Sequence, residues 1–413
     1  MNCNRFFFDC KRKGFLSIML VYIIVITYFY LSFSIAFSRS NDVDVLDINT
    51  NATDLGLTSK SYVLMEASTG TVICDKAKDE KLSPASITKI MTLLIIFEEL
   101  EKGNIALNDE VITSAYAKSM GGSQVFLEEG EKQSVETLIK CIVVASGNDA
   151  CVAMAEHIAG SESEFVTRMN DKAKKIGMNN TNFEDCCGLT DSDNHYTSAY
   201  DVALMSRELI IKYPEIHNYS TIWMENITHK TNKGETEFGL ANTNKLLKMY
   251  PYTTGLKTGS TSKAKYCVAA TAKKDDIELI AIVMAAPDYK VRFSEAETLL
   301  KYGYGVCKVY KDNNKDLKKY IKIEGGVSET VKVMAEKTFN YVSLTEEDFG
   351  NIKKNIIFNK KVVAPLKKGD TVGKIEYSIG DESIGSVDII VCKDIEKASF
   401  SNALWKIFTK YIL

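Results

Sequence analysis

The chain has 413 residues, of which 45% are hydrophobic and 25% are charged, and its formal net charge is -3. A chain of this length and composition is expected to fold into two domains, because single cores rarely grow so large. The balanced charge, with no basic stripe interleaved with aromatic residues, gives no indication of nucleic-acid binding.

The N-terminal segment predicts export. Basic residues from Lys11 to Lys13 precede an apolar run from Phe15 to Phe37, an order typical of a secretory signal. Small residues up to Ala36 suit cleavage, but the run is also long enough to span a bilayer. We therefore expect a signal peptide or membrane anchor over 1–37, followed by a flexible lead-in over 38–57.

The next part of the chain has strands at both ends of a helical middle. This order predicts that distant strands pair in one sheet beside a helical insertion, which is an α+β fold. The expected elements, in chain order, are strands within 61–76, helices over 83–103, 135–160, 163–178 and 199–212, strands within 255–286, and a helix over 293–304.

Beyond about residue 310 the pattern changes to short β-rich runs separated by turns, which predicts a small all-β domain over 309–396. The last residues, 397–413, place apolar side chains at helical spacing, with Trp405 and Lys406 among them. Such an amphipathic helix could lie in a membrane interface or pack on the β domain, and we favour the membrane.

A first candidate site lies where the helix over 83–103 begins. Ser86 and Lys89 are three residues apart, so their hydroxyl and amine can meet on one helix face. Ser83 is expected to cap this helix, with Pro84 in its first turn. Free backbone N–H groups at such a position favour developing negative charge.

The spacing alone is not specific, because it recurs in this chain. The pairs Ser260/Lys263 and Ser262/Lys265 also match Ser-x-x-Lys. A nucleophile with its base is therefore one interpretation of Ser86, and an ordinary helix start is the other.

Two further polar elements follow. Ser146 and Asn148 interrupt apolar helical runs, where they must cap a helix junction or face a site, since buried polar groups need partners. The rival triplet 192–194, Ser-Asp-Asn, lies in a turn-rich loop that explains it. Lys257-Thr258-Gly259 lies in a predicted strand, where a cation and a hydroxyl can bind a carboxylate and glycine permits close approach.

In this order, Ser-Ile-Thr-Lys (86–89), Ser-Gly-Asn (146–148) and Lys-Thr-Gly (257–259) resemble the penicillin-binding proteins, in particular the low-molecular-mass D-alanyl-D-alanine carboxypeptidases. The resemblance covers residues 58–308 and extends to the β domain and amphipathic tail. It implies a β-lactamase/transpeptidase-like catalytic domain with an antiparallel sheet, flanking helices and a helical insertion, then a β-sandwich-like domain.

The resemblance also implies an activity, without a metal or other cofactor. The enzyme would remove the terminal D-alanine from peptidoglycan stem pentapeptides through a serine acyl-enzyme, and penicillins would acylate the same serine. It would act at the outer face of the cytoplasmic membrane of a bacterium, in the cell wall space.

Matched motif by motif, the resemblance implies a role for each candidate residue. Lys89 can act as a base only if desolvation and a nearby cation such as Lys257 disfavour its charged form. The implied roles are the nucleophile Ser86, the base Lys89, the proton relay Ser146, the peptide-binding Asn148, the carboxylate-binding Lys257 and Thr258 with Gly259 in the same strand, the oxyanion-binding N–H groups of Ser86 and Ser260, and the carboxylate-assisting Arg292.

Other functions stay open at this point. A serine β-lactamase shares the nucleophile chemistry, and a non-catalytic β-lactam- or peptidoglycan-binding protein could keep the same fold. A histidine-dependent hydrolase is disfavoured, because Gly-x-Ser-x-Gly is absent from the sequence. Most of the ten cysteines lie in apolar segments and are expected to be buried, and the adjacent pair Cys186-Cys187 is interpreted as structural.

Overall fold

The computed structural model describes residues 55–231, 234–317, 320–344 and 349–402. The predicted export segment (1–37), most of the predicted lead-in (38–57) and residues 403–413 of the predicted terminal helix lie outside the described residues. Within the described ranges, no helix combines the length and the apolar character needed to cross a membrane.

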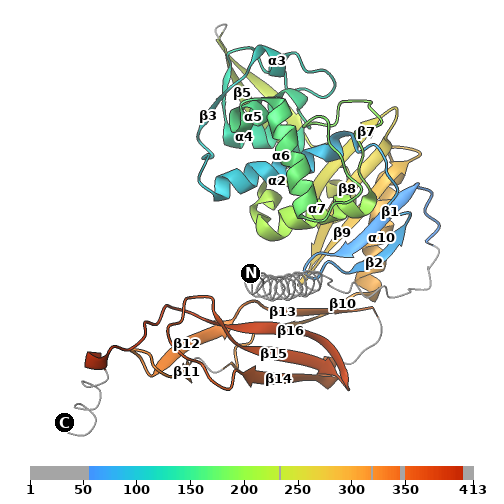
Figure 1. The fold of residues 1–413 in the computed structure, drawn as a ribbon. Helices are drawn as coiled ribbons and strands as arrows, with labels where there is room; N and C mark the ends of the chain where they lie inside the picture. The colour runs from blue at the N-terminus through green and yellow to red at the C-terminus, as the bar shows by residue number, and fades with distance from the viewer. Residues whose placement is uncertain (1–54, 232–233, 318–319, 345–348, 403–413) are drawn as a thin grey trace, which may run out of the picture. The chain divides into compact units, whose positions relative to one another are not determined.

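The part of the chain before residue 308 is built on a five-stranded antiparallel sheet in the order β2-β1-β9-β8-β7 (Figure 1). The first strand pairs with one that comes much later in the chain, so that Ser61 lies opposite Met284. This pairing of distant strands confirms the α+β prediction. The strands are β1 (Ser61–Glu66), β2 (Val72–Lys76), β7 (Thr253–Thr261), β8 (Lys265–Lys274) and β9 (Ile277–Ala286).

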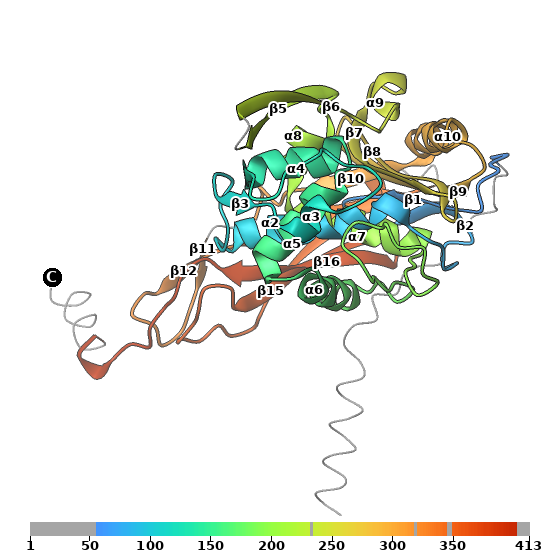
Figure 2. The same cartoon turned by 90° about the horizontal axis from the view of Figure 1, so that it is seen from above.

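Both faces of this sheet are covered, because its central strands are apolar on both sides. On β1, Val63 and Met65 belong to the larger core, whereas Leu64 belongs to a second core on the opposite face. Alternate side chains of a strand point to opposite faces, which explains this division. Figure 2 shows α10 (Val291–Val306) on one side of the strands and α7 (Ala199–Lys212) on the other.

The larger core is mainly helical. Apolar residues of α2, α4 and α5 are buried in it together with one face of the sheet. The helices predicted between 135 and 178 are confirmed, with a break at Ser146. The elements between β2 and β7 are the 3-10 turn η1 (Ala85–Thr88), α2 (Lys89–Glu101), β3 (Glu110–Ile112), α3 (Ala115–Lys118), β4 (Lys132–Ser134), α4 (Val135–Val144), α5 (Asn148–Ala159), α6 (Glu162–Lys175), α7, η2 (Pro214–Ile216), α8 (His217–Ser220), β5 (Met224–Thr231), β6 (Gly234–Ala241) and α9 (Leu246–Met249).

The C-terminal part is a β domain, as predicted. A five-stranded sheet in the order β11-β12-β16-β15-β14 shares one core with the β10–β13 pair. The rings of Phe339 and Tyr377 stack inside it with centroids 3.7 Å apart. The elements are β10 (Lys308–Asp312), β11 (Tyr320–Lys322), β12 (Thr330–Ala335), β13 (Phe339–Ser343), η3 (Phe349–Asn351), β14 (Ile352–Phe358), β15 (Thr371–Ile379) and β16 (Glu382–Val391).

Candidate active site

Ser86 lies in a tight turn that precedes the main helix of the larger core. The turn Ala85–Thr88 is a 3-10 helix, and the α-helix begins only at Lys89. The prediction that Ser83 caps this helix is wrong, because Pro84 occupies the cap position and no side chain caps the turn. Local sequence could not reveal this, since Ala85 has a φ of 48°, which non-glycine residues rarely adopt.

The unusual backbone at Ala85 is supported from a neighbouring loop. A Cβ built at Gly188 would lie 1.8 Å from the Ala85 carbonyl oxygen, and Gly188 itself has a φ of 77°. Only glycine allows the loop to approach this closely. The conformation of the Ser86 turn therefore depends on a residue that the motif analysis did not identify.

Lys89 is fully buried beneath this turn and donates three hydrogen bonds. Its Nζ atom lies 3.0 Å from Ser86 Oγ, 2.6 Å from Asn148 Oδ1 and 2.7 Å from the carbonyl oxygen of Cys187. All three acceptors are uncharged oxygens, and one of them belongs to the main chain. This buried amine therefore lies within hydrogen-bonding distance of the Ser86 hydroxyl.

The junction between α4 and α5 places the Ser-Gly-Asn motif (146–148) beside Lys89. Ser146 has a φ of 62° and separates the two helices, and Asn148 is the first residue of α5. Asn148 Nδ2 donates to the Gly121 carbonyl oxygen at 2.7 Å, which orients its Oδ1 atom toward Lys89. The two polar residues that break the apolar pattern thus face the site.

A second buried lysine, Lys257, lies on strand β7, which carries the Lys-Thr-Gly motif and is called the K-T-G strand below. Lys257 is 1% exposed and donates to Ser146 Oγ at 2.9 Å and to the Thr258 carbonyl oxygen at 3.1 Å. Burial, followed by repulsion from Lys89, holds the pKa of Lys257 well below its ordinary value. Ser146 and Lys257 thus form a second hydrogen-bonded serine–lysine pair, close enough to the first for Lys89 to repel Lys257.

The outer end of the K-T-G strand lies beside the buried Arg292. Arg292 Nη1 donates to the carbonyl oxygens of Gly259 at 3.1 Å and Cys267 at 3.3 Å, while its Nε atom has no partner among the described residues. Thr258 Oγ1 donates to Thr243 Oγ1 at 2.7 Å. Cationic and hydroxyl groups thus surround the strand segment to which the sequence assigns carboxylate binding.

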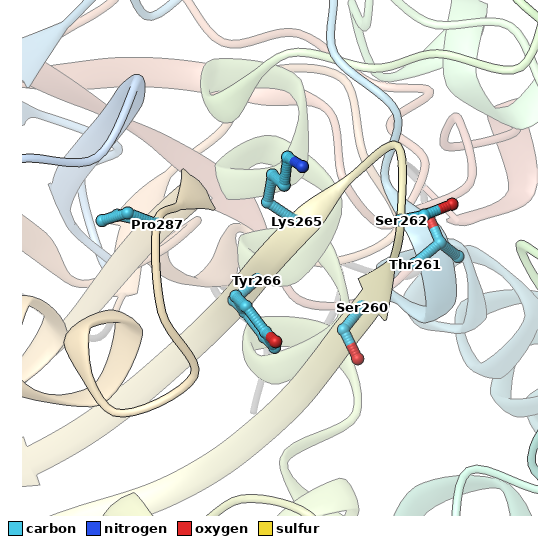
Figure 3. A pocket seen from close by; sticks show the side chains of 6 residues that line it. All are labelled: Ser260, Thr261, Ser262, Lys265, Tyr266 and Pro287. Atoms are coloured by element: carbon cyan, nitrogen blue, oxygen red, sulfur yellow. The ribbon is translucent and has the colours of Figure 1, made fainter.

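Next to this segment is an open pocket of about 360 Å³. Figure 3 shows Ser260 and Tyr266 at its wall, on the two strands β7 and β8 and close to their connecting turn. Since Ser260 directly follows Gly259, the pocket continues the polar strand edge toward solvent. Its full lining is Ser260, Thr261, Ser262, Lys265, Tyr266 and Pro287.

In the alternative Ser-x-x-Lys matches, Lys263 binds a neighbouring loop rather than Ser260. Lys263 Nζ is bound to Asp193 Oδ1 at 2.6 Å and to the Asp191 carbonyl oxygen at 2.8 Å, on an exposed loop. Ser192 Oγ accepts from the N–H group of Asn194, so the triplet 192–194 forms a turn. The structure thus gives Lys263 and the triplet 192–194 ordinary surface roles, whereas it brings Ser86, Lys89, Ser146, Asn148 and Lys257 together.

Comparisons with known proteins show the family to which the chain belongs. Residues 48–288 match the peptidase S11 family model, described as D-alanyl-D-alanine carboxypeptidase. The chain belongs to the D-alanyl-D-alanine carboxypeptidase family. Residues 304–397 of this carboxypeptidase match a second model, the C-terminal domain of penicillin-binding protein 5.

Individual relatives agree with the family match. The D-alanyl-D-alanine carboxypeptidase DacF of Bacillus subtilis is 41% identical over 350 residues, covering 84% of this chain and 88% of that protein. DacA of Haemophilus influenzae is 31% identical and covers 91% of this chain and 95% of its own length. The crystal structure of penicillin-binding protein 5 from Haemophilus influenzae has a TM-score of 0.67 at 31% identity, covering 83% of this chain and 98% of that one.

The family assignment confirms the predicted fold class, a β-lactamase/transpeptidase-like catalytic domain followed by a β domain. It also confirms the carboxypeptidase function that the three motifs predicted. Enzymatic carboxypeptidase activity, rather than passive binding, is what the matched relatives are named for.

Proposed function

We propose that this carboxypeptidase cleaves the terminal D-alanine from peptidoglycan stem pentapeptides, with Ser86 as nucleophile and Lys89 as its general base. The observation that carries this assignment is the 3.0 Å contact between Lys89 Nζ and Ser86 Oγ, inside a buried set of neutral acceptors. In its neutral form the amine accepts the Ser86 proton while Oγ attacks the penultimate D-alanine carbonyl.

The remaining residues bind the negatively charged groups of the substrate and transfer a proton to the leaving amine. Lys257, Thr258 and Arg292 provide positive potential and donors for the terminal carboxylate, and the N–H groups of Ser86 and Ser260 receive the oxyanion. Ser146 accepts a hydrogen bond from Lys257 at 2.9 Å, which leaves its own hydrogen free to pass to the leaving amine. Asn148 orients Lys89 and binds the substrate peptide, and water then hydrolyses the acyl-enzyme.

Penicillins enter the same scheme as acylating inhibitors, because the β-lactam carbonyl presents the same electrophile beside a carboxylate. The family acts on bacterial peptidoglycan, which supports an exported enzyme at the outer face of the cytoplasmic membrane. In this proposal the segment 1–37 directs export as a signal peptide or membrane anchor, and the amphipathic segment 397–413 attaches the enzyme to the membrane surface.

Mass spectrometry of the purified enzyme tests the assignment. We expect wild-type enzyme to gain one penicillin adduct on Ser86 and to release D-alanine from a D-Ala-D-Ala peptide. Ser86→Ala should lose both, and the matched control Ser192→Ala, in the exposed loop, should keep both. Labelling that persists in Ser86→Ala would refute the nucleophile, and rapid penicillin turnover without D-alanine release would favour a β-lactamase.

A further inference from the structure

A cluster of three cysteine side chains lies next to the buried Lys89, which the Cys187 carbonyl oxygen contacts. The side chains of Cys151, Cys186 and Cys187 are almost completely buried, and all three cysteines are free thiols. Burial, then hydrogen bonds to the Cys151 and Cys187 thiols, raises the pKa of the Cys186 thiol. The Cys186 thiol therefore lies beside both of the other thiols.

A carboxylate completes this cluster. Ligand atoms of Glu162, Cys186 and Cys187 all lie within 4.8 Å of one another. Two ligands of a tetrahedral Zn²⁺ ion, bound at about 2.3 Å, are separated by roughly 3.8 Å. Side-chain movements on the order of 1 Å would therefore bring these three atoms to one ion.

The carboxylate is already fixed in place. Glu162 Oε1 accepts from the Cys186 N–H group at 3.0 Å, and Oε2 accepts from the Tyr116 hydroxyl at 2.6 Å. A ligand carboxylate that also accepts such hydrogen bonds is oriented as in known zinc sites. Glu162 is only partly buried, so an ion can enter from its side.

We propose that Glu162, Cys186 and Cys187 form a binding site for a thiophilic divalent cation, with Zn²⁺ as the matching ion. Two thiolates and one carboxylate suit Zn²⁺, whereas Ca²⁺ and Mg²⁺ prefer oxygen ligands alone. On binding, each of the two thiols loses its proton to solvent and forms a metal–sulfur bond. Water takes the fourth position, or the Cys151 thiol after a rotation.

Metal binding at this site can affect the catalytic base Lys89 through the main-chain carbonyl groups of the two cysteines. The Cys186 carbonyl oxygen accepts from Thr92 Oγ1 at 2.5 Å, and the Cys187 carbonyl oxygen accepts from Lys89 Nζ at 2.7 Å. Drawing the two thiols toward one ion therefore displaces a carbonyl that positions Lys89. We infer that bound Zn²⁺ slows acylation of Ser86; this second step rests on the proposed function, whereas the binding site does not.

The sequence alone predicts no metal here, because the ligands lack a recognised spacing. Glu162 begins α6, whereas the two cysteines lie in the loop after it. The loop is drawn together by Asp185, whose carboxylate accepts from the N–H groups of Cys187 at 2.8 Å and Thr190 at 2.7 Å. The cluster thus exists only in the folded chain.

Metal titration of the full chain tests the site. The reduced, chelator-treated protein is titrated with Zn²⁺ against a chromophoric chelator, and with Cd²⁺ while thiolate-to-metal charge-transfer absorption is recorded. We expect a single bound equivalent and a charge-transfer band. Cys186→Ser and Cys187→Ser should abolish the band, and the control Cys74→Ser, a partly exposed thiol in β2, should retain it.

Glu162→Gln keeps the proposal testable if the buried cysteine variants fail to fold. Its amide oxygen can still accept from Cys186 or Tyr116, and loss of a direct ligand should weaken Zn²⁺ binding by at least about tenfold. Unchanged affinity in all three ligand variants, or no charge-transfer band with wild type, would overturn the site.

The coupling to catalysis has a separate readout. Zn²⁺ should slow acylation by a fluorescent penicillin in wild type but not in Cys187→Ser, while Ser86→Ala should bind Zn²⁺ like wild type. Tight Zn²⁺ binding with an unchanged acylation rate would refute the coupling. Loss of labelling without any change in metal binding would instead concern only the catalytic roles proposed above.

Discussion

Gly259 of the K-T-G strand packs against the main chain of Ser86. A Cβ built at position 259 would lie 3.0 Å from the Ser86 nitrogen and 2.8 Å from the Pro84 carbonyl oxygen. The glycine therefore sets how closely β7 approaches the nucleophile turn, in addition to leaving space for substrate.

Gly259→Ala should separate the strand from the Ser86 turn. Because displacements of about 1 Å at a reacting group can cost roughly 100-fold in rate, we expect acylation by a fluorescent penicillin to slow by about that factor. Gly305→Ala, where a Cβ would meet nothing within 4 Å, is the control. Wild-type kinetics in Gly259→Ala would show that this close packing is not needed.

Asn148→Asp should lower acylation near neutral pH. The new carboxylate would lie where Asn148 Oδ1 now stands 2.6 Å from Lys89 Nζ, and it would stabilise the ammonium form of that base. The acylation rate should drop by about tenfold or more at neutral pH and recover as pH rises. Stopped-flow measurement of the acylation rate over a series of pH values tests this expectation. Asn148→Ala should also acylate more slowly, but the dependence of its acylation rate on pH should not shift to higher pH.

Lys257→Met should stabilise the fold while removing activity. In wild type the unfolded chain binds the Lys257 proton up to a pKa near 10.5, whereas the folded protein holds that pKa well below this value. The unfolded state thus carries more protons between the two pKa values, so this group makes stability rise with pH. We expect a gain on the order of 1–4 kcal/mol at neutral pH, since a methionine avoids burying a charge.

The pH dependence separates this explanation from a packing effect. The difference in free energy of unfolding between Lys257→Met and wild type should shrink as pH approaches 10.5, measured by urea unfolding at several pH values. A difference that stays constant with pH would mean that desolvation of the charged amine is not its cause.

Glu295→Ala should destabilise the catalytic domain. The buried Glu295 carboxylate accepts from the Thr58 nitrogen at 2.5 Å and the Ser59 nitrogen at 3.2 Å, and it also binds the Ser59 hydroxyl. Leaving these donors without a partner should cost about 2–4 kcal/mol in the free energy of unfolding. The control is Glu297→Ala, two residues along the same helix, which removes only a surface ion pair with Lys301 and should cost at most about 1 kcal/mol. Equal losses in the two variants would contradict the assigned role of Glu295.

The sequence predicted the features that have a side-chain signature. The order of the three motifs identified the family, and apolar periodicity located α4, α5 and α7 and the strands within 255–286. The hairpin of β5 and β6 was not predicted, because its strands are largely exposed and lack a clear apolar alternation. Short, half-solvated strands of this kind give little periodic signal.

The main-chain contributions to the site could not be predicted from the sequence either. The carbonyl oxygen of Cys187 holds Lys89, but any residue carries such an oxygen, so no residue type indicates it. The same is true of the left-handed backbone at Ala85, which depends on the approach of Gly188 from a distant loop. Tertiary contacts, rather than local preference, define these two features.

The pairing of β1 with β9 also governs when the enzyme can become active. Strand β1 can pair with β9 only after the chain has been synthesised as far as Met284, which lies opposite Ser61. The sheet that carries Lys257 is therefore completed only when nearly the whole catalytic domain has been made. Such long-range pairing slows folding and leaves an apolar strand edge unpaired in the meantime. A chain that ends before Ile277 would carry all three motifs and yet lack β9, so antibiotic labelling of truncated chains should report folding rather than the presence of the motifs.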